Sequence, residues 1–553
     1  AIGQKPTVVI VVSEVTVTMP RMIYRSSART VPVNYTDMVK RLRRLLRPYS
    51  VHAIIDACIE VLDKWRGTGL DELKSAPWLT LLIVKLVLED RSISLRGTKP
   101  CPTALIDEIR NDLWNTPDAR EHEGSPSIYL MFRSLVHTQF LFQQAESFSF
   151  LRWPALISRL PPEHALRGQF EAEFGCDPDT FIGVVFAAYS AVMQGKTFIT
   201  LNYWEPLRPL YGSAIDRFLD RFAKDATDLR KLLVDELHRR VYTAVEGRKM
   251  LRPDAAARPE SERIEFPWVS RFPFFRHASG RLAVWHRLVF ARGMEDGVHN
   301  VLSSLGQAYT DPFSKIFEGY VVELIRNSGL DFVSEHEIKG GVASRPAVEA
   351  LVHADSCNVF IESKMSLFPD RVLISDRGPE IFMKMRRIRE GMVQGWRVGE
   401  MLRDGTVQVD GASNAEQDFL LIVTSRQLNV CSGEHFKRMF GEDVIARINP
   451  ESKFVGPTAL QLDRLPLKNI FVLSIEEFEH LTSAIAEGSV DLIPLLKAAA
   501  LKNADPVTSS MHFDQILSTQ VNRWTHSRLI RATRLRIERQ LRGWLNGTEP
   551  SSR

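Results

Sequence analysis

The sequence predicts a protein of several domains, with a mostly helical N-terminal half, a smaller α/β core in which helices flank a mixed sheet, and a basic helical C-terminal tail. A chain of 553 residues is too long to fold around one hydrophobic core. Apolar residues recur at helical spacing in the first half, whereas short apolar runs separated by turns follow Asp311. The expected domains are a helical recognition or regulatory region (1–251), a linker and aromatic-rich connector (252–310), an α/β domain (311–485) and a helical C-terminal region (486–553).

Composition and charge exclude several classes of protein. Hydrophobic residues make up 44% and charged residues 25% of the chain, as in folded globular domains, which argues against a disordered protein. The apolar run Val8–Val12 is too short to cross a bilayer and lacks signal-peptide flanks. We interpret it as a strand and expect a cytoplasmic protein without membrane partners. Five widely spaced cysteines with no C-x-x-C pair argue against a structural zinc site or a disulfide framework.

The N-terminal half carries helix signals but no motif that indicates chemistry. Thr36 and Ser50 are expected N-caps, and apolar residues recur at three- and four-residue spacing from Val51 to Leu62. We find no repeat of fixed period that would indicate a solenoid. The sequence therefore predicts helices here without indicating a specific activity.

The α/β domain is expected to begin with a helix and continue with five strands. Asp311–Pro312 supplies an N-cap and a proline at the start of the helix, and Gly329 ends it. A long helical stretch, Ile381–Leu402, separates the third strand from the fourth, which predicts a mixed sheet with helices packed on it. The expected strands are Asp331–Ile338, Ala347–His353, Asn358–Ser363, Phe419–Thr424 and Asn469–Leu473.

The second and third strands carry the side chains that indicate chemistry. The two-residue period of a strand puts Phe360, Glu362 and Lys364 on one face. If the two strands form a hairpin centred on Asp355–Ser356, then Glu349 lies directly opposite Glu362. Side chains opposed in this way lie roughly 5 Å apart at Cβ. Two carboxylates at that separation repel one another, so a cation between them is expected.

Glu-x-Lys is a common tripeptide, and its context distinguishes one copy from the others. Four copies occur in the chain, ending at Lys74, Lys339, Lys364 and Lys453. The copy ending at Lys364 alone terminates an apolar strand, follows a turn and has a carboxylate at the partner position. The competing interpretation is an ordinary surface ion pair on a solvent-facing strand.

Four segments of the chain share a pattern with a known enzyme family. They are Phe317–Leu324, Val348–Val352, Phe360–Lys364 and Val393–Gly395. Together they resemble the PD-(D/E)XK, or restriction-endonuclease-like, nuclease superfamily over about residues 311–481. The resemblance implies a restriction-endonuclease-like core, a central mixed sheet flanked by helices, that binds Mg²⁺, with Mn²⁺ as a substitute.

The resemblance also implies roles for five residues. Glu349 stands where the motif usually has an aspartate, which is one methylene shorter, and Glu362 is the second metal ligand. Lys364 is the catalytic lysine. Glu318 matches an acidic residue on the helix before the sheet, where it would complete the metal shell, and Gln394 matches a catalytic glutamine on the helix after it. An ordinary solvated helix face is the alternative for both Glu318 and Gln394.

The expected activity is that of a Mg²⁺-dependent nuclease, in first place a DNA endonuclease that hydrolyses phosphodiester bonds. Analogy with the family alone suggests a setting in bacterial antiviral defence or mobile-element biology. An RNA-cleaving nuclease is an open alternative, because a metal contacts phosphate and not sugar. The hypothesis from another class is a catalytically inactive, nuclease-like scaffold that binds nucleic acid or assembles with a protein partner. A homodimer also stays open, because a close pair of cuts in a duplex needs two sites.

Basic residues in two places are candidates for nucleic-acid contacts. Between Arg523 and Arg542 the tail has seven arginines and a single acid, Glu538. Further cations lie near the start of the long helix of the α/β domain. The expected contacts are Lys384, Arg387, Arg528, Arg531 and Arg534. The alternative for the tail is an amphipathic helix that docks on an acidic partner domain through Leu535, Leu541 and Trp544.

Overall fold

The computed structural model describes residues 34–545 except 68–70, 73–74, 117–128, 131–132, 134–135, 137–147, 246–247, 252–266, 366–372, 374–377, 449–455 and 523. The expected strand at Val8–Val12 and the expected linker that begins at residue 252 lie outside the described residues. Within the described part of the chain, no helix combines the length and the apolar character needed to span a bilayer.

The chain divides into two compact units, which we name the α/β unit and the helical unit. The α/β unit contains Phe317–Ser366 and Gly378–Ser527, and the helical unit contains Val31–Ile316 and Arg528–Arg553. The α/β unit is thus inserted, in sequence, between two parts of the helical unit. These bounds differ from the expected ones. The helices that follow residue 485 pack beside the sheet, and the last helix returns to the helical unit.

The helical unit confirms the expected helical N-terminal half. Its most buried helix is α4, which packs on α2, α5 and α12. Ser50 caps α2 as expected, whereas Asn34 and not Thr36 caps α1. The helices of this half are α1 (Tyr35–Leu46), α2 (Val51–Lys64), α4 (Pro77–Glu89), α5 (Thr103–Asn115), α7 (Arg152–Ser158), α8 (Ala165–Phe174), α9 (Pro178–Met193), α10 (Arg208–Tyr211), α11 (Ala214–Phe222), α12 (Ala226–Val241) and α13 (Arg287–Leu302).

Short strands complete the helical unit. A sheet has the strand order β1-β6-β5-β2, and β3 and β4 form a separate hairpin. The strands are β1 (Phe198–Ile199), β2 (Ala223–Lys224), β3 (Tyr242–Val245), β4 (Arg248–Leu251), β5 (Phe274–Arg276) and β6 (Leu282–Val284). The aromatic-rich connector that the sequence placed between the domains supplies β5 and β6 of this sheet, so it is part of the helical unit.

The helix that leads into the α/β unit, α14 (Gln307–Ser328), begins earlier than expected. Pro312 lies inside this helix and not at its first position. Proline has no N–H to donate to the carbonyl four residues earlier. The side chain of Gln169 donates to that carbonyl, on Ala308, at 3.5 Å. Gly329, with a φ of 80°, follows the end of the helix as expected.

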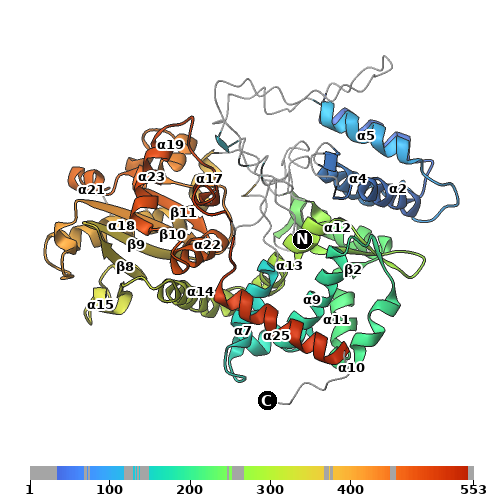
Figure 1. The fold of residues 1–553 in the computed structure, drawn as a ribbon. Helices are drawn as coiled ribbons and strands as arrows, with labels where there is room; N and C mark the ends of the chain where they lie inside the picture. The colour runs from blue at the N-terminus through green and yellow to red at the C-terminus, as the bar shows by residue number, and fades with distance from the viewer. Residues whose placement is uncertain are drawn as a thin grey trace. The chain divides into compact units, whose positions relative to one another are not determined.

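The α/β unit is built on a five-stranded mixed sheet in the order β11-β10-β9-β8-β7 (Figure 1). β9, β10 and β11 are parallel, β8 is antiparallel to β9, and β7 is antiparallel to β8. The strands are β7 (Val333–Ser334), β8 (Ala350–Ala354), β9 (Cys357–Lys364), β10 (Gln417–Thr424) and β11 (Ile470–Ser474). The predicted combination of a helical half and an α/β half with a mixed sheet is therefore confirmed.

The expected strand Asp331–Ile338 is wrong over most of its length. Only Val333 and Ser334 pair with β8, and α15 (Glu335–Lys339) follows at once. A capping box explains the change, because Glu337 accepts from Ser334 N at 2.8 Å while Ser334 Oγ accepts from Glu337 N at 3.5 Å. The cap favours a helix start over the strand that the apolar pattern suggested.

Helices cover both faces of the sheet (Figure 1). On one face α18 packs against β9 and β10. On the other face Phe513 of α24 lies edge-on to Phe471 of β11 at 5.7 Å. The expected helix Ile381–Leu402 is present as two helices. The helices of the unit after α15 are α17 (Gly378–Lys384), α18 (Arg386–Arg403), α19 (Gly433–Phe440), α20 (Val444–Arg447), α21 (Ala459–Arg464), α22 (Ile475–Ala486), α23 (Leu492–Ala504) and α24 (Phe513–Leu517).

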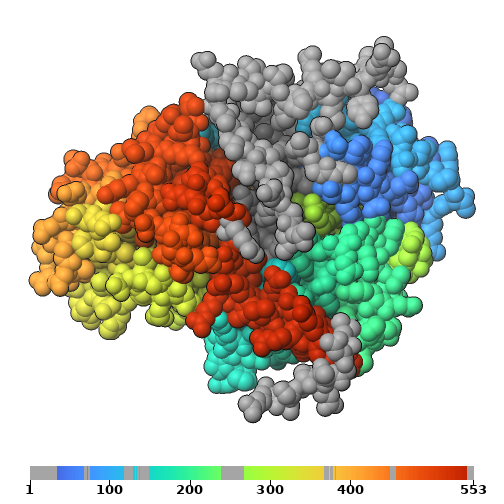
Figure 2. Space-filling model, in the orientation of Figure 1, coloured from blue at the N-terminus to red at the C-terminus, as the bar shows by residue number. Residues whose placement is uncertain are grey.

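The last helix, α25 (Arg528–Leu545), packs on α7 within the helical unit. Its buried apolar stripe consists of Leu529, Ile530 and Ile537. The expected apolar side, Leu535, Leu541 and Trp544, is therefore wrong for Leu535, which is 53% exposed. The reason is helical spacing. Leu535 lies two residues before Ile537, about half a turn around the helix, and so it faces away from the buried stripe. Figure 2 shows α25 in red at the surface of the helical unit.

Three glycines let α18 approach the sheet closely. Gly391, Gly395 and Gly399 recur every four residues and so share one face of the helix. A Cβ on Gly395 would lie 2.9 Å from Leu420 Cδ2, and a Cβ on Gly391 would lie 3.2 Å from Ile422 Cδ1. Both leucine and isoleucine are fully buried on β10. The glycines therefore set the distance between α18 and the sheet face that carries Glu362.

We predict that Gly395→Ala destabilises the α/β unit relative to Gly319→Ala. Gly319 lies within α14 and a Cβ there meets nothing within 4 Å. Both substitutions gain about 1 kcal/mol of helix propensity, so their difference isolates the overpacking cost at Gly395, about 1–3 kcal/mol. Denaturant unfolding of the two variants measures this difference. Equal unfolding free energies would show that α18 has room to shift.

Candidate active site

The β8–β9 hairpin has the register that the sequence predicted. Ala354 pairs with Cys357 and His353 with Asn358, and the ladder continues to Ala350 with Ile361. The turn residues Asp355 and Ser356 have φ values of 48° and 57°. Left-handed conformations at both central positions are those of a two-residue type I′ hairpin turn. The next position along this register places Glu349 opposite Glu362.

Glu349 is fixed at the end of the ladder by the residue after Glu362. Its carboxylate accepts from Ser363 N at 2.8 Å and from Ser363 Oγ at 2.8 Å. The Glu349 carbonyl accepts from Glu335 N at 3.1 Å, which ties the same residue to the start of α15. The side chain is half-buried and is held in a defined position beside β9.

Glu362 is a buried acid with a strong preference for its neutral form. The residue is 2% exposed. Burial raises the pKa of Glu362 well above its usual range, and the neighbouring Glu349 carboxylate raises it further. Lys364 Nζ donates to Glu362 and lowers this pKa, but burial and Glu349 together outweigh the lysine. Glu362 therefore keeps its proton at a pH where an ordinary glutamate has lost it.

Gln394 on α18 lies next to the start of β8. Its Nε2 donates to the Ala347 carbonyl at 3.1 Å, two residues before Glu349. The structure thus brings four of the five expected residues to one end of the hairpin. Glu318 is half-buried on α14. Within the described ranges no three His, Cys, Asp or Glu side chains form a group that could hold a metal ion, so Glu318 does not complete a three-ligand set.

The donor set suits a hard divalent cation held by few protein ligands. Glu349 and Glu362 offer carboxylate oxygens only, which is the chemistry that Mg²⁺ and Mn²⁺ prefer. Mg²⁺ is commonly held by one or two carboxylates together with waters and substrate phosphates. The pair at the end of the hairpin fits this pattern, and a cation bound there would take the place of the proton that burial and Glu349 keep on Glu362.

The site lies at the end of the parallel strands where ligands of α/β sheets are usually found. Lys364 is the last residue of β9 and pairs with Thr424, the last residue of β10. In open α/β sheets ligands bind outside the carboxyl ends of the strands. The position of Glu362 and Lys364 agrees with that rule.

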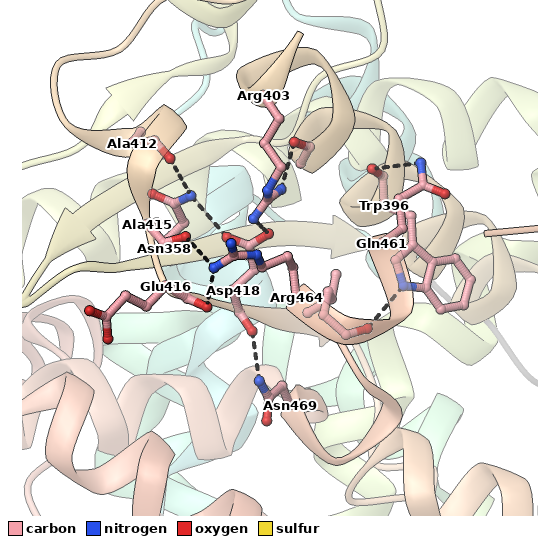
Figure 3. Close-up of polar contacts among 12 residues, drawn as sticks. Asn358, Trp396, Arg403, Ala412, Ala415, Glu416, Asp418, Gln461, Arg464 and Asn469 are labelled. Carbon is pink, nitrogen blue, oxygen red and sulfur yellow. Dashed lines mark hydrogen bonds and ion pairs between the residues drawn. The ribbon is translucent and has the colours of Figure 1, made fainter. Parts of the chain in front are cut away.

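The opposite end of β9 and β10, where these strands begin, carries a buried polar network that is structural (Figure 3). Asn358 Nδ2 donates to Asp418 Oδ1 at 2.9 Å, and Arg403 donates to Asp418 Oδ2 at 2.5 Å. Asn469 Nδ2 donates to the Asp418 carbonyl at 2.9 Å. Burial raises the pKa of Asp418, while the adjacent Arg403 opposes that rise. Both carboxylate oxygens of Asp418 thus have a donor within the chain, and one of the two donors is a cation, Arg403.

One residue of the site was missed by the sequence interpretation. Ser363 holds Glu349 through its backbone N–H and its hydroxyl. Strand alternation points Ser363 to the other face, so the two-residue period gave no reason to connect it with Glu349. The hydroxyl at the middle position of Glu-x-Lys was the only available signal.

The expected nucleic-acid contacts fall into two groups. Lys384 and Arg387 are exposed around the start of α18, where Arg387 pairs with Glu390 at 3.2 Å. Arg528 and Arg531 are exposed on α25, and no ion pair is found for either among the residues that the structure describes. Arg534 is half-buried, pairs with Glu538 at 2.7 Å and lies over the ring of Phe148 at 4.5 Å. Arg534 therefore has partners within the chain.

The chain has no detectable counterpart in three comparisons. Neither family models nor curated proteins nor solved structures give a match. The functional argument therefore rests on the chemistry of the site itself.

We predict that Glu362→Gln changes how the stability of the protein depends on pH in the absence of metal. A carboxyl group whose pKa is raised in the folded state keeps its proton while the unfolded chain loses one. The parent protein therefore loses stability as pH rises from the usual carboxyl range to the raised pKa of Glu362. The stability gained by Glu362→Gln should accordingly grow with pH across this window.

Unfolding free energies of both proteins in EDTA, measured across this pH window, test the prediction. Glu477, whose pKa burial raises to about 7, adds the same pH dependence to both proteins and cancels in the difference. Parallel curves for parent and variant would contradict a charged, unfavourable Glu362.

Proposed function

We propose that the α/β unit is a metal-dependent nuclease with a restriction-endonuclease-like core that hydrolyses phosphodiester bonds, in first place of DNA. One observation carries the proposal: Glu349 and Glu362 oppose each other at the end of a hairpin, with Lys364 on the same strand face. Two carboxylates and one lysine at a shared point are the groups that metal-assisted phosphodiester hydrolysis needs.

Glu349 and Glu362 would hold Mg²⁺ or Mn²⁺. When bound, this ion offsets charge on the scissile phosphate and supplies an activated water. In its absence Lys364 donates to Glu362 and partly offsets its charge. Lys364, on the same strand face as Glu362, would then donate to the attacked phosphate or orient the water.

Two further groups support the proposed site by positioning. Ser363 holds the Glu349 carboxylate with two hydrogen bonds of 2.8 Å. Gln394 fixes the chain before β8 through the Ala347 carbonyl. Both residues act through Glu349, so each is a positioning residue and not a catalytic one. A carboxylate with a fixed position loses less conformational entropy when it binds a metal.

The exposed arginines of α25 are proposed to contact nucleic-acid phosphates. Arg528 and Arg531 are exposed on the outer side of a helix whose opposite side is anchored by Leu529, Ile530 and Ile537. A rigid helix that carries arginines on its free side is a suitable phosphate-binding element. Arg534, which has partners within the chain, is the weakest of the three candidates.

A second candidate function is supported by a specific observation. Among the described residues the acidic cluster has two carboxylates, with no third ligand in place. A nuclease-like scaffold that binds nucleic acid without cutting it would need no third ligand. The cleavage experiment below separates this function from the first.

We predict that Glu362→Gln and Lys364→Ala each lower the rate of metal-dependent cleavage by at least about 100-fold. The chain supplies a matched control, because Glu337-Ile338-Lys339 is a second Glu-x-Lys sequence that lies on the short helix α15. Lys339 pairs with Glu335 at 2.5 Å on the surface and should be replaceable by alanine without loss of activity. The assay uses supercoiled plasmid, single-stranded DNA and RNA with Mg²⁺, Mn²⁺ or EDTA.

Each outcome of this assay identifies one function. Cleavage by the parent and by Lys339→Ala, with loss in the two site variants, supports the nuclease and shows which nucleic acid it cuts. Equal cleavage in all four proteins would overturn the assignment of the site. Binding without cleavage in any metal would favour the scaffold. A rate of duplex cleavage that rises with the square of protein concentration would indicate that two copies act together.

A further inference from the structure

A cluster of cations and aromatic rings in the α/β unit has no role in the site described above. The guanidinium groups of Arg389 and Arg447 lie over the ring of Phe382, at 4.4 and 4.5 Å from its centroid. Phe436 and Phe440 pack behind that ring at 5.9 and 5.3 Å. We name these five residues the Phe382 cluster. It joins α17, α18, α19 and α20.

Arg389 is the unusual member of the cluster. It is 5% exposed, and its Nε has no hydrogen-bond partner in the part of the chain that the structure describes. Arg447, by contrast, donates to the Phe440 carbonyl at 3.0 Å and pairs with Asp443. Burial lowers the pKa of Arg389, and the nearby Arg386 and Arg447 lower it further, while Glu390 opposes this shift. A buried guanidinium without a hydrogen-bonded anion is costly for the folded chain.

The start of α18 adds further cations near Arg389. No side chain caps the helix, and its first turn contains Arg386 and Arg387, which pair with Glu390 at 2.7 and 3.2 Å. Cations at a helix N-terminus oppose the helix dipole. Side chains on a helix tilt toward its N-terminus, so Arg389 points back to this uncapped end. Exposed Lys384 at the end of α17 adds a further cation.

The position of α18 places this end beside the candidate active site. Gly391 lies against Ile422, and Gly399 lies against Asp418, so α18 runs antiparallel to β10. Ile422 pairs with Glu362 on the neighbouring strand. One helical turn before Gly391, the chain therefore reaches the level of Thr424 and Lys364, where the strands end.

We propose that the Phe382 cluster and the first turn of α18 form a phosphate-binding subsite for the nucleic-acid strand that enters the Glu349–Glu362–Lys364 site. This inference rests on the proposed function and adds to it where the strand is held. Arg389 supplies a planar donor pair suited to phosphate oxygens. Phe382 keeps the guanidinium in place from behind.

The test is binding of a fluorescent single-stranded oligonucleotide and of a duplex, followed by anisotropy in EDTA, so that no cleavage is needed. We expect Arg389→Met to weaken binding about tenfold. The slope of the logarithm of affinity against the logarithm of salt concentration should fall by about 0.7–0.9. Unlike a structural arginine, Arg389 should be replaceable without loss of thermal stability, because its removal relieves an unpaired buried charge.

The matched control is Arg326→Met, which removes the same charge from the same unit. Arg326 is exposed in the last turn of α14, and no ion pair is found for it among the described residues. Its loss should leave both affinity and salt slope close to those of the parent. If Arg389→Met does not fold, Arg386→Gln serves instead, because Arg386 is 60% exposed at its side chain. It should weaken binding and lower the salt slope in the same sense.

The results separate this inference from the proposed function. Loss of affinity in Arg389→Met, or in Arg386→Gln where that variant replaces it, supports the subsite even if no protein cuts nucleic acid. Parent-like affinity in Arg389→Met would overturn the subsite, and a reduced stability of that variant would show that the arginine is structural. Parent-like affinity in Arg386→Gln would overturn it in the same way. Cleavage by the parent with unchanged binding in these variants would leave the nuclease standing and remove the subsite alone.

Discussion

The repulsion between Glu349 and Glu362 is the constraint on which the rest of the α/β unit depends. The two-residue turn at Asp355–Ser356 fixes the register of the hairpin, and that register places the two carboxylates at its far end. A like-charged pair directly opposed on a sheet is destabilising unless other groups compensate. Ser363 donates to Glu349, and Lys364 donates to Glu362. Burial and the Glu349 charge nevertheless raise the pKa of Glu362 well above its usual range. The metal-free pair thus reduces its repulsion by keeping a proton on Glu362, and a bound cation would take the place of that proton.

The burial of Glu362 follows from the packing of α18. Glycine at every fourth position brings that helix close to β10, and a Cβ at Gly395 would already touch Leu420. A more distant helix would leave water above Glu362 and lower the cost of its charge. The same packing sets the direction of α18 and brings its uncapped start to the ends of the strands. Fold and proposed chemistry are therefore coupled through one helix–sheet contact.

Periodicity predicted the centre of the site, but not its surroundings. The hairpin register, the shared face of Glu362 and Lys364, and the mixed sheet followed from strand alternation and one turn. Other expectations were wrong for local reasons. A capping box starts a helix at Glu335, so most of the expected strand Asp331–Ile338 does not form. Pro312 lies inside α14, where the Gln169 side chain donates to the carbonyl that the proline leaves without its helical donor. Contacts between elements far apart in the sequence could not be predicted from periodicity alone. Nothing in the sequence indicated that Arg389 stacks on Phe382, or which stripe of α25 is buried.

The two ends of β9 and β10 differ in whether their buried charged groups find partners within the chain. At the start of the strands Asp418 accepts from Asn358 and Arg403 on both carboxylate oxygens, so a cation of the chain pairs with this carboxylate. At the other end two groups lack such a partner. Glu362 keeps its proton beside Glu349, and Arg389 Nε has no hydrogen-bond partner among the described residues. A divalent cation would pair with the two carboxylates, and a nucleic-acid phosphate would pair with Arg389. That a single bound substrate complex supplies both ions is the strongest physical argument for the proposed reaction.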